Sequence, residues 1–239
     1  MIKLKNKVGI CVIILLVVVL VASSTYLYMQ YKQEKEEENI FEELSNVIIE
    51  NDTNNKEMNN KKNVTKLYEE NNDFIGWLEI ENTNICYPVM KTEQERKDYY
   101  LKRNFYKEYS NMGTPYIAEQ CDIIDSDNII IYGHHITNNK MFGELENYKD
   151  KKFYNSHKII NFNTIYGEME YEIIAVFKTI AYSDTGFKYY NFIKAENEQE
   201  YNAFINKCKV LSLYQTEKTA IYGDKLLTLS TCEYSNKNR

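Results

Sequence analysis

The sequence predicts a mostly β fold with inserted helices, preceded by a transmembrane helix. Short runs rich in β-branched and aromatic residues recur between turn signals from residue 74 onward, a rhythm typical of a β-barrel or a sandwich. Two longer segments, 140–149 and 194–213, carry helical periodicity instead. The third observation is an apolar run near the N-terminus. The remainder of the 239 residues, in a chain that is 44% hydrophobic, can bury one sizeable core.

The apolar run predicts a single membrane crossing. Residues 8–31 include no charged residue, and the segment through Met29 is long enough to span about 30 Å of hydrocarbon. Three lysines precede it and four glutamates crowd residues 34–38, so the positive-inside rule places the N-terminus in the cytoplasm and the folded part outside the cell. A cleaved signal peptide is the alternative, but the run is longer than a typical signal core and no clear A-x-A site follows.

Two segments of different composition lie between this anchor and the β-rich region. Residues 33–50 have apolar side chains at helical spacing under a charged face, which predicts a short amphipathic helix. The Asn-rich run 51–63 predicts a flexible stalk or loop. The expected domains are therefore residues 1–31 as cytoplasmic tip and transmembrane anchor, 32–63 as helical and Asn-rich stalk, and 64–239 as the folded domain.

The folded domain supplies seven candidate strands and two candidate helices. In the helical segment 194–213, Phe204 and Cys208 fall on one stripe together with Ala203 and Leu211. The predicted strands are Phe74–Ile80, Asn84–Val89, Thr114–Ala118, Asn128–Tyr132, Lys158–Asn163, Met169–Tyr182 and Lys225–Thr231.

Charge and cysteine usage exclude several classes of function. The formal net charge of −6 argues against a nucleic-acid-binding protein, which needs a clustered basic surface. The five cysteines, at positions 11, 86, 121, 208 and 232, form no CxxC pair, so neither a zinc site nor a disulfide framework is expected. Cys86, Cys121 and Cys208 are expected to be small buried or half-buried side chains. No metal or other cofactor is predicted.

The residues that could perform chemistry are few. A cysteine nucleophile needs a proton-transfer partner and a donor for the oxyanion. The chain has three histidines (134, 135 and 157) and three arginines (96, 103 and 239). His134 follows the strand-like run that ends at Gly133, and Cys232 ends the run that begins at Lys225. Taken singly, a histidine at a strand end is usually a polar surface residue and a lone cysteine is usually inert.

Taken together, these two runs resemble the sortase family, and specifically its class B. Leu229-Ser-Thr-Cys232 closes a late strand, and Tyr132-Gly-His134 closes an earlier one. Several segments in the same order make the resemblance specific, and it covers about residues 64–239. These further segments are Asn72–Ile80, Asn84–Val89, Tyr99–Asn104, Gly113–Tyr116 and Met141–Phe142.

The resemblance implies an eight-stranded barrel with helices near the N-terminus and a long helix before the cysteine strand, which residues 194–213 would form. The family cleaves a C-terminal sorting signal after Thr, forms a thioacyl enzyme and passes the acyl group to an amine. The implied partners are surface proteins that bear sorting signals and an amine acceptor on peptidoglycan or pilin. The segment 64–239 would then be the catalytic domain of a cysteine transpeptidase held at the cell membrane.

The same resemblance assigns roles to individual residues. Cys232 would be the nucleophile, His134 would assist as an imidazolium and protonate the leaving amine, and Arg239 would hold the substrate carbonyl. Arg96, Arg103 and His157 are expected at the solvated surface, and His135 beside the site or exposed. Five positions match those that line or flank the substrate groove, although the sequence leaves a structural role open for each: Asn104, Tyr132, Ser230, Thr231 and Glu233.

The match is incomplete at Arg239. In the family the chain continues there into a strand that closes the barrel, so we expect the last strand to be missing, with an unpaired edge, lower stability and weak turnover. This expectation keeps a second hypothesis open, namely a membrane-anchored interaction module with a sortase-like barrel and weakened catalysis. A cysteine protease of another fold is a third, but the papain-like signature is missing around Cys232.

Overall fold

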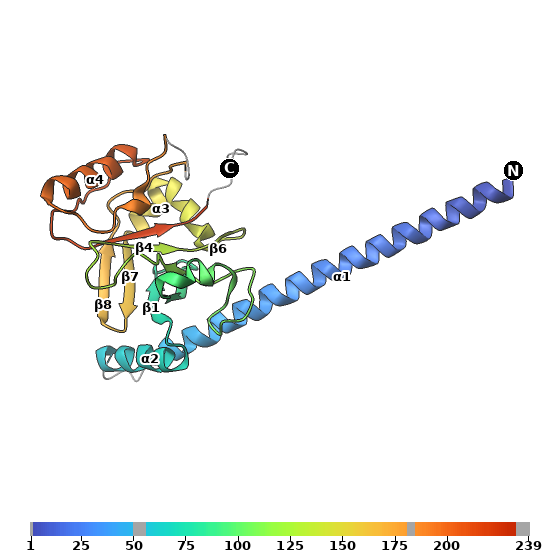
Figure 1. Ribbon diagram of the computed structural model, residues 1–239, viewed down its shortest axis with the longest axis horizontal. Helices are drawn as coiled ribbons and strands as arrows, with labels where there is room; N and C mark the ends of the chain where they lie inside the picture. The colour runs from blue at the N-terminus through green and yellow to red at the C-terminus, as the bar shows by residue number, and fades with distance from the viewer. Residues whose placement is uncertain (1, 50–55, 181–184, 233–239) are drawn as a thin grey trace. The chain divides into compact units, whose positions relative to one another are not determined.

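The computed structural model describes residues 2–49, 56–180 and 185–232 (Figure 1). The chain divides into two compact units, Met1–Ile40 and Phe41–Arg239. The first unit belongs to one continuous helix, α1 (Ile2–Ile49), where the sequence predicted a membrane helix followed by a separate amphipathic one. Residues 30–43 are rich in Gln, Lys and Glu, which are good helix formers, so nothing ends the helix there.

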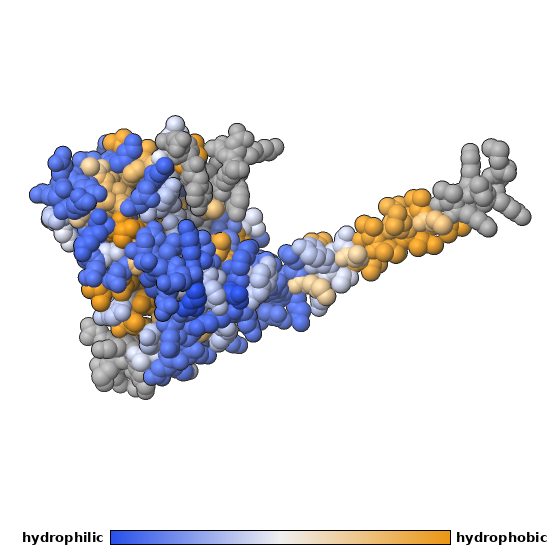
Figure 2. Space-filling model, in the orientation of Figure 1, coloured by the Kyte–Doolittle hydropathy of each residue, from blue (hydrophilic) through white to orange (hydrophobic). Residues whose placement is uncertain are grey.

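The apolar part of α1 meets the length and composition that a membrane crossing requires. One helix in the described residues passes this test, over Gly9–Ile48, and none of its most apolar window is buried within the protein. Figure 2 shows the resulting hydrophobic band along the helix. The side chains of Thr25 and Gln30 donate hydrogen bonds within the helix, to Val21 and Tyr26.

The flexible segment predicted over residues 51–63 is instead helical from residue 56, where helix α2 (Lys56–Glu70) begins. Although Asn is a weak helix former, the segment also holds Lys, Glu and Met, and its second half buries Val64 and Leu67 as the helix packs against β1 and β7. Tertiary packing of the apolar face therefore outweighs local propensity. Residues 50–55 of the predicted stalk lie outside the described residues.

Truncation of Leu67 tests whether α2 is an integral part of the folded unit. Leu67 is 0% exposed, so Leu67→Ala is expected to lower the free energy of unfolding by about 2–3 kcal/mol through lost burial and a cavity. Its exposed neighbour on the same helix supplies the control, and Lys66→Ala should change stability by less than about 0.5 kcal/mol. Urea unfolding of both variants measures the difference. Equal stabilities would mean that α2 is detached in solution.

Seven strands form one nearly closed barrel sheet in the order β8-β7-β1-β2-β3-β4-β9. All pairs are antiparallel except β2 with β3 and β4 with β9. The sheet therefore realises the predicted mostly β fold with inserted helices. The strands are β1 (Phe74–Glu79), β2 (Cys86–Met90), β3 (Tyr116–Ile117), β4 (Asn128–Tyr132), β7 (Ile159–Thr164), β8 (Gly167–Glu172) and β9 (Leu226–Ser230).

The core lies along β1, β4 and β7. Trp77, Leu78, Ile130 and Phe162 are at most 1% exposed. At Gly76 a Cβ would come within 2.7 Å of the Asn163 carbonyl oxygen, so the close approach of β1 to β7 requires glycine there. β4 and its neighbour β9 are the last two strands in the order of the sheet, so the packed sheet fixes where their C-terminal ends lie.

Two predicted elements differ from the structure. The strand predicted over Met169–Tyr182 ends at Glu172, because the next residues pair with a loop: Leu213 N donates to Val176 O at 2.8 Å. Residues 181 and 182 of that prediction lie outside the described residues. The helix predicted over 140–149 begins only at Phe142 and is a 3₁₀ helix, η3 (Phe142–Lys149). Residues 140–141 form β6 (Lys140–Met141), paired with β5 (His135–Ile136).

Helix α4 (Glu198–Leu211) confirms the helix predicted over 194–213. Its N-cap is Asn197, whose side chain accepts a hydrogen bond from Glu200 N, and four of its residues are buried: Tyr201, Phe204, Ile205 and Cys208. Phe204 stacks on Phe192 with ring centroids 3.9 Å apart. The remaining helices are η1 (Gln94–Arg96), η2 (Tyr99–Lys102), α3 (Lys151–Ser156) and η4 (Tyr189–Asn191).

Candidate active site

The two principal candidate residues follow the ends of β4 and β9, which form a parallel pair (Figure 1). Tyr132 is the register partner of Ser230, and Gly133 N continues the ladder to Ser230 O at 3.1 Å. The Thr231 hydroxyl donates to Gly133 O at 2.8 Å. His134 and Cys232 each follow the last register pair by two residues, on adjacent strands that run in the same direction. Residues from opposite halves of the domain therefore lie at the same end of this strand pair.

Cys232 differs from the other cysteines of the folded unit by its exposure. It is exposed, whereas Cys86 is half-buried and Cys121 and Cys208 are buried, as the sequence predicted for these three. Burial raises the pKa of all three and brings that of Cys208 to about 12. Their thiols are therefore poor sources of thiolate. Cys232 is the accessible thiol of the described part of the folded unit.

His134 is half-buried and held by a backbone carbonyl. Its Nε2 lies 2.7 Å from the carbonyl oxygen of Leu101, in η2. Because a carbonyl oxygen can only accept, Nε2 must carry the hydrogen, which leaves Nδ1 as the nitrogen that can take up or release a proton. The backbone is fixed as well, since Phe142 N donates to His134 O at 3.0 Å. The imidazole is thus oriented in one tautomer.

Burial lowers the pKa of His134 below the ordinary histidine value of 6.5, and the Leu101 carbonyl, which favours the protonated ring, offsets this only in part. The ring is therefore mainly neutral at neutral pH, whereas the resemblance implied an imidazolium. A neutral imidazole can accept the thiol proton. The same shift predicts a measurable pH dependence.

Because the folded-state pKa of His134 is below that of the unfolded chain, protonation favours unfolding. We expect full stability from this group above about pH 6.5, and a progressive loss as the pH falls from there through the folded-state pKa. His134→Gln should remove this loss, so its unfolding free energy should fall less than that of the native chain between about pH 7 and about pH 5. An NMR titration of His134 at or above 6.5 would contradict the assignment.

The other two histidines have structural contacts. His135 is half-buried in β5, and its Nε2 lies 3.5 Å from Glu146 Oε1. His157 was predicted at the solvated surface at a strand start. It is instead half-buried at the C-terminus of α3, with Nδ1 2.8 Å from Phe153 O and its ring stacked on that of Phe153 at 4.1 Å. Packing of the imidazole on an aromatic neighbour explains the difference.

The arginine predictions have mixed outcomes. Arg239, the predicted oxyanion donor, and Glu233 lie outside the described residues. The Arg96 side chain is 37% exposed, and its guanidinium also donates to both carboxylate oxygens of Asp73, at 3.1 and 2.8 Å. Arg103 donates to Lys107 O and lies over the Tyr99 ring at 4.6 Å. Both arginines are thus partly exposed, and each also has a partner that the sequence did not predict.

The remaining predicted groove residues divide into two groups. Ser230 and Thr231 adjoin Cys232, and the Ser230 hydroxyl lies 2.5 Å from the hydroxyl of Tyr189. Asn104 is buried, and its side chain accepts a hydrogen bond from Glu108 N, which is a turn-forming contact. The Tyr132 ring packs against that of Tyr116, with centroids 5.7 Å apart. All four residues thus have structural contacts, and Ser230 and Thr231 also directly precede Cys232 in the chain. Their role in a substrate groove stays a prediction.

Two contributors to the site were missed in the sequence. Tyr189 bonds Ser230 from η4, and Leu101 holds His134 through its main chain. Every residue has a backbone carbonyl, so the sequence could not indicate the role of Leu101, which only the fold shows. Within the described ranges, no group of three or more His, Cys, Asp or Glu side chains is placed to bind a metal ion.

Comparison with known proteins gives a consistent result. A family model described as "Sortase domain" matches residues 78–239. Sortase B from Staphylococcus aureus (strain NCTC 8325 / PS 47) is 31% identical over 166 residues, or 68% of this chain, and Sortase B from Listeria monocytogenes is 32% identical over 165 residues, also 68%. The chain spans 64% of the length of both curated relatives.

Solved structures agree over a larger part of the fold. A Staphylococcus aureus sortase B-substrate complex superposes with a TM-score of 0.76 at 26% identity, covering 87% of this chain and 93% of that one. A structure of Sortase B complexed with triglycine superposes with a TM-score of 0.72, also at 26% identity, covering 85% of this chain and 90% of that one. The barrel with its helices is therefore shared with these proteins.

Proposed function

Because this chain belongs to the sortase family, as a class B member, we propose that it is a cysteine transpeptidase with Cys232 as nucleophile and His134 as proton-transfer partner. The observation that carries the proposal is the parallel pairing of β4 with β9, which places the exposed thiol and the oriented imidazole at the ends of adjacent strands. A nucleophile beside an oriented base is the arrangement that acyl transfer needs.

The chemistry follows from the tautomer of His134. The neutral ring accepts the Cys232 thiol proton at Nδ1 while Nε2–H stays bonded to Leu101 O. The sulfur then attacks the carbonyl carbon of the scissile peptide, and the C–N bond breaks as Nδ1 returns that proton to the leaving amine. A thioester remains on Cys232. An incoming amine attacks it and loses a proton to Nδ1. The C–S bond then breaks, and the sulfur takes that proton from Nδ1, which restores the thiol and the neutral ring.

The substrates of this reaction are part of the proposal. We infer a C-terminal sorting signal of a surface protein, cleaved after Thr, as acyl donor, and an amine of the cell wall or of a pilin as acceptor. Relatives solved with a substrate and with triglycine support a peptide donor and an amine acceptor. Arg239 is proposed to stabilise the oxyanion, with Glu233 at the groove. We further propose that α1 anchors the enzyme in the cell membrane, with its N-terminus in the cytoplasm.

Trapping of the thioester tests the function. The full chain is incubated with a set of sorting-signal peptides, with and without triglycine, and analysed by mass spectrometry. We expect an acyl adduct on Cys232 that hydroxylamine releases, and a new peptide joined to triglycine. Peptide binding with neither adduct nor product would contradict catalysis and would support the second hypothesis, an interaction module with a sortase-like barrel.

A further inference from the structure

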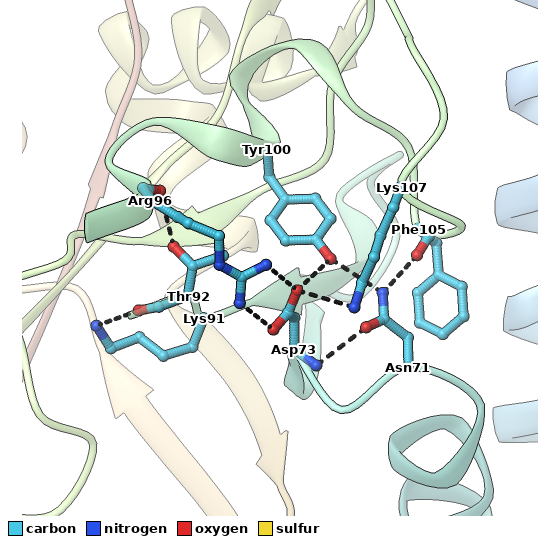
Figure 3. Close-up of polar contacts among 8 residues, drawn as sticks. All are labelled: Asn71, Asp73, Lys91, Thr92, Arg96, Tyr100, Phe105 and Lys107. Atoms are coloured by element: carbon cyan, nitrogen blue, oxygen red, sulfur yellow. Dashed lines mark hydrogen bonds and ion pairs between the residues drawn. The ribbon is translucent and has the colours of Figure 1, made fainter. Parts of the chain in front are cut away.

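A charged cluster lies at the start of β1, outside the residues that perform the chemistry (Figure 3). The Asp73 carboxylate, 11% exposed, receives two hydrogen bonds from Arg96 and lies 3.2 Å from Lys107 Nζ. The Tyr100 hydroxyl donates to Asp73 Oδ2 at 3.0 Å and accepts from Asn71 Nδ2 at 3.0 Å. Burial opposes ionisation of Asp73, yet the bonds from Arg96, Tyr100 and Lys107 outweigh it and lower the pKa of its carboxyl group.

Tyr100 connects this cluster to the histidine. It is 0% exposed and belongs to η2, directly before Leu101, whose carbonyl holds His134 Nε2. The backbone of η2 is also held on its other side, since Tyr100 O accepts from Thr114 N at 3.0 Å. The phenol and the main chain of η2 are therefore both fixed, and the peptide unit that holds the imidazole has little freedom to rotate.

We propose that Tyr100, anchored by Asp73, is a positioning residue for the catalytic imidazole: it fixes η2 so that the carbonyl of Leu101 keeps His134 in its Nε2–H tautomer. The importance of Tyr100 for turnover rests on the proposed function. The tautomer of His134, in contrast, depends only on the folded chain and can be measured without any substrate. The alternative is that the cluster serves only the stability of the fold. These two roles are separable, because a stability role predicts no change in the ring nitrogens of His134.

Gly113 packs against the backbone of η2 at Tyr100 and Leu101. It has a φ of +63°, and a Cβ at this position would come within 2.7 Å of both the Tyr100 and the Leu101 carbonyl oxygens. Ser110 Oγ accepts from Gly113 N at 3.0 Å and keeps this segment in place. The chain thus packs glycine directly against the carbonyl that holds His134. Gly113→Ala would displace that carbonyl without touching the imidazole.

The test reads the ring nitrogens of His134 by ¹⁵N NMR in the full chain above about pH 7, where the ring is neutral. The native protein should show a protonated Nε2 and an unprotonated Nδ1. Tyr100→Phe retains the ring and removes the hydroxyl, so both nitrogens should shift toward values averaged between the two tautomers. Turnover of a sorting peptide should fall about tenfold in kcat with KM nearly unchanged. Gly113→Ala should shift the nitrogens in the same direction.

Tyr201→Phe is the matched control. Tyr201 is also 0% exposed, but it lies in α4, and its hydroxyl donates to Asp224 O at 2.9 Å rather than to a group of the Asp73 cluster. It should leave the His134 nitrogens as in the native protein. The proposal is overturned if the native ring is already a mixture of tautomers, or if folded Tyr100→Phe and Tyr201→Phe give the same ring spectrum. Absence of turnover in the native chain with the expected tautomers would contradict the proposed function alone.

Discussion

Cys232→Ala is expected to abolish cleavage of sorting peptides, with a loss of about 10³-fold or more in kcat/KM, because no other accessible thiol among the described residues stands beside His134. The loss should leave the fold intact, since the Cys232 side chain is exposed. Peptide cleavage followed by chromatography measures the rate. The same variant should form no hydroxylamine-sensitive adduct.

Cys208→Ala is the control for this result. Cys208 is buried among apolar side chains that include Phe204 and Phe192, so the change should lower stability but leave the rate per folded molecule almost unchanged. Circular dichroism and thermal melting measure the folded fraction of each variant, by which its rate is divided. More than a few per cent of activity in Cys232→Ala, or a lost rate in folded Cys208→Ala, would show that the nucleophile has been misassigned.

His134→Ala should reduce kcat by about 10²–10⁴-fold, the range that removal of a general acid and base produces. His135→Ala, at the adjacent position, should keep most of the rate, because the His135 side chain lies against Glu146. The two variants differ by one residue and therefore control for each other. Kinetics at several pH values measure both, and the pH dependence that comes from His134 should vanish only in the first.

The opposite order of effects would mean that the register at the end of β4 is wrong by one residue, since a shift of one position turns a strand side chain to the other face. Equal, mild effects would remove histidine from the mechanism altogether. Because Tyr132 pairs with Ser230 in the structure, we expect neither outcome.

The long apolar strands and their ends were predictable from the sequence. The run Asn128–Tyr132 is β4 without any change of boundary, and Leu226–Ser230 differs from the predicted Lys225–Thr231 by one residue at each end. Continuous β-branched and aliphatic residues bounded by polar ones or by glycine leave few other structures. Because His134 and Cys232 follow the ends of these strands, the same signal also indicated where the proposed catalytic residues lie.

The remainder depended on tertiary contacts that sequence patterns do not encode. Residues 56–63 look like a stalk because the apolar side chains that hold α2 come only later, at Val64 and Leu67. The ion pair of Arg96 with Asp73 could not be predicted, because the two residues lie 23 positions apart in sequence. Leu101 contributes through its main chain, so its side chain gave no signal. Each of these features follows from a neighbour supplied by the fold.

The pairing of β4 with β9 also bears on how the protein folds. The two strands join residues that are 100 positions apart, as in the bond from Thr228 to Asn128. Closing a loop of this length costs roughly 4 kcal/mol of chain entropy before any contact repays it, and pairing of distant strands is slow. We therefore expect the proposed catalytic pair, Cys232 and His134, to assemble late in folding, so that folding intermediates hold the two residues apart. The rate at which activity returns on refolding would then measure the rate at which β4 and β9 pair.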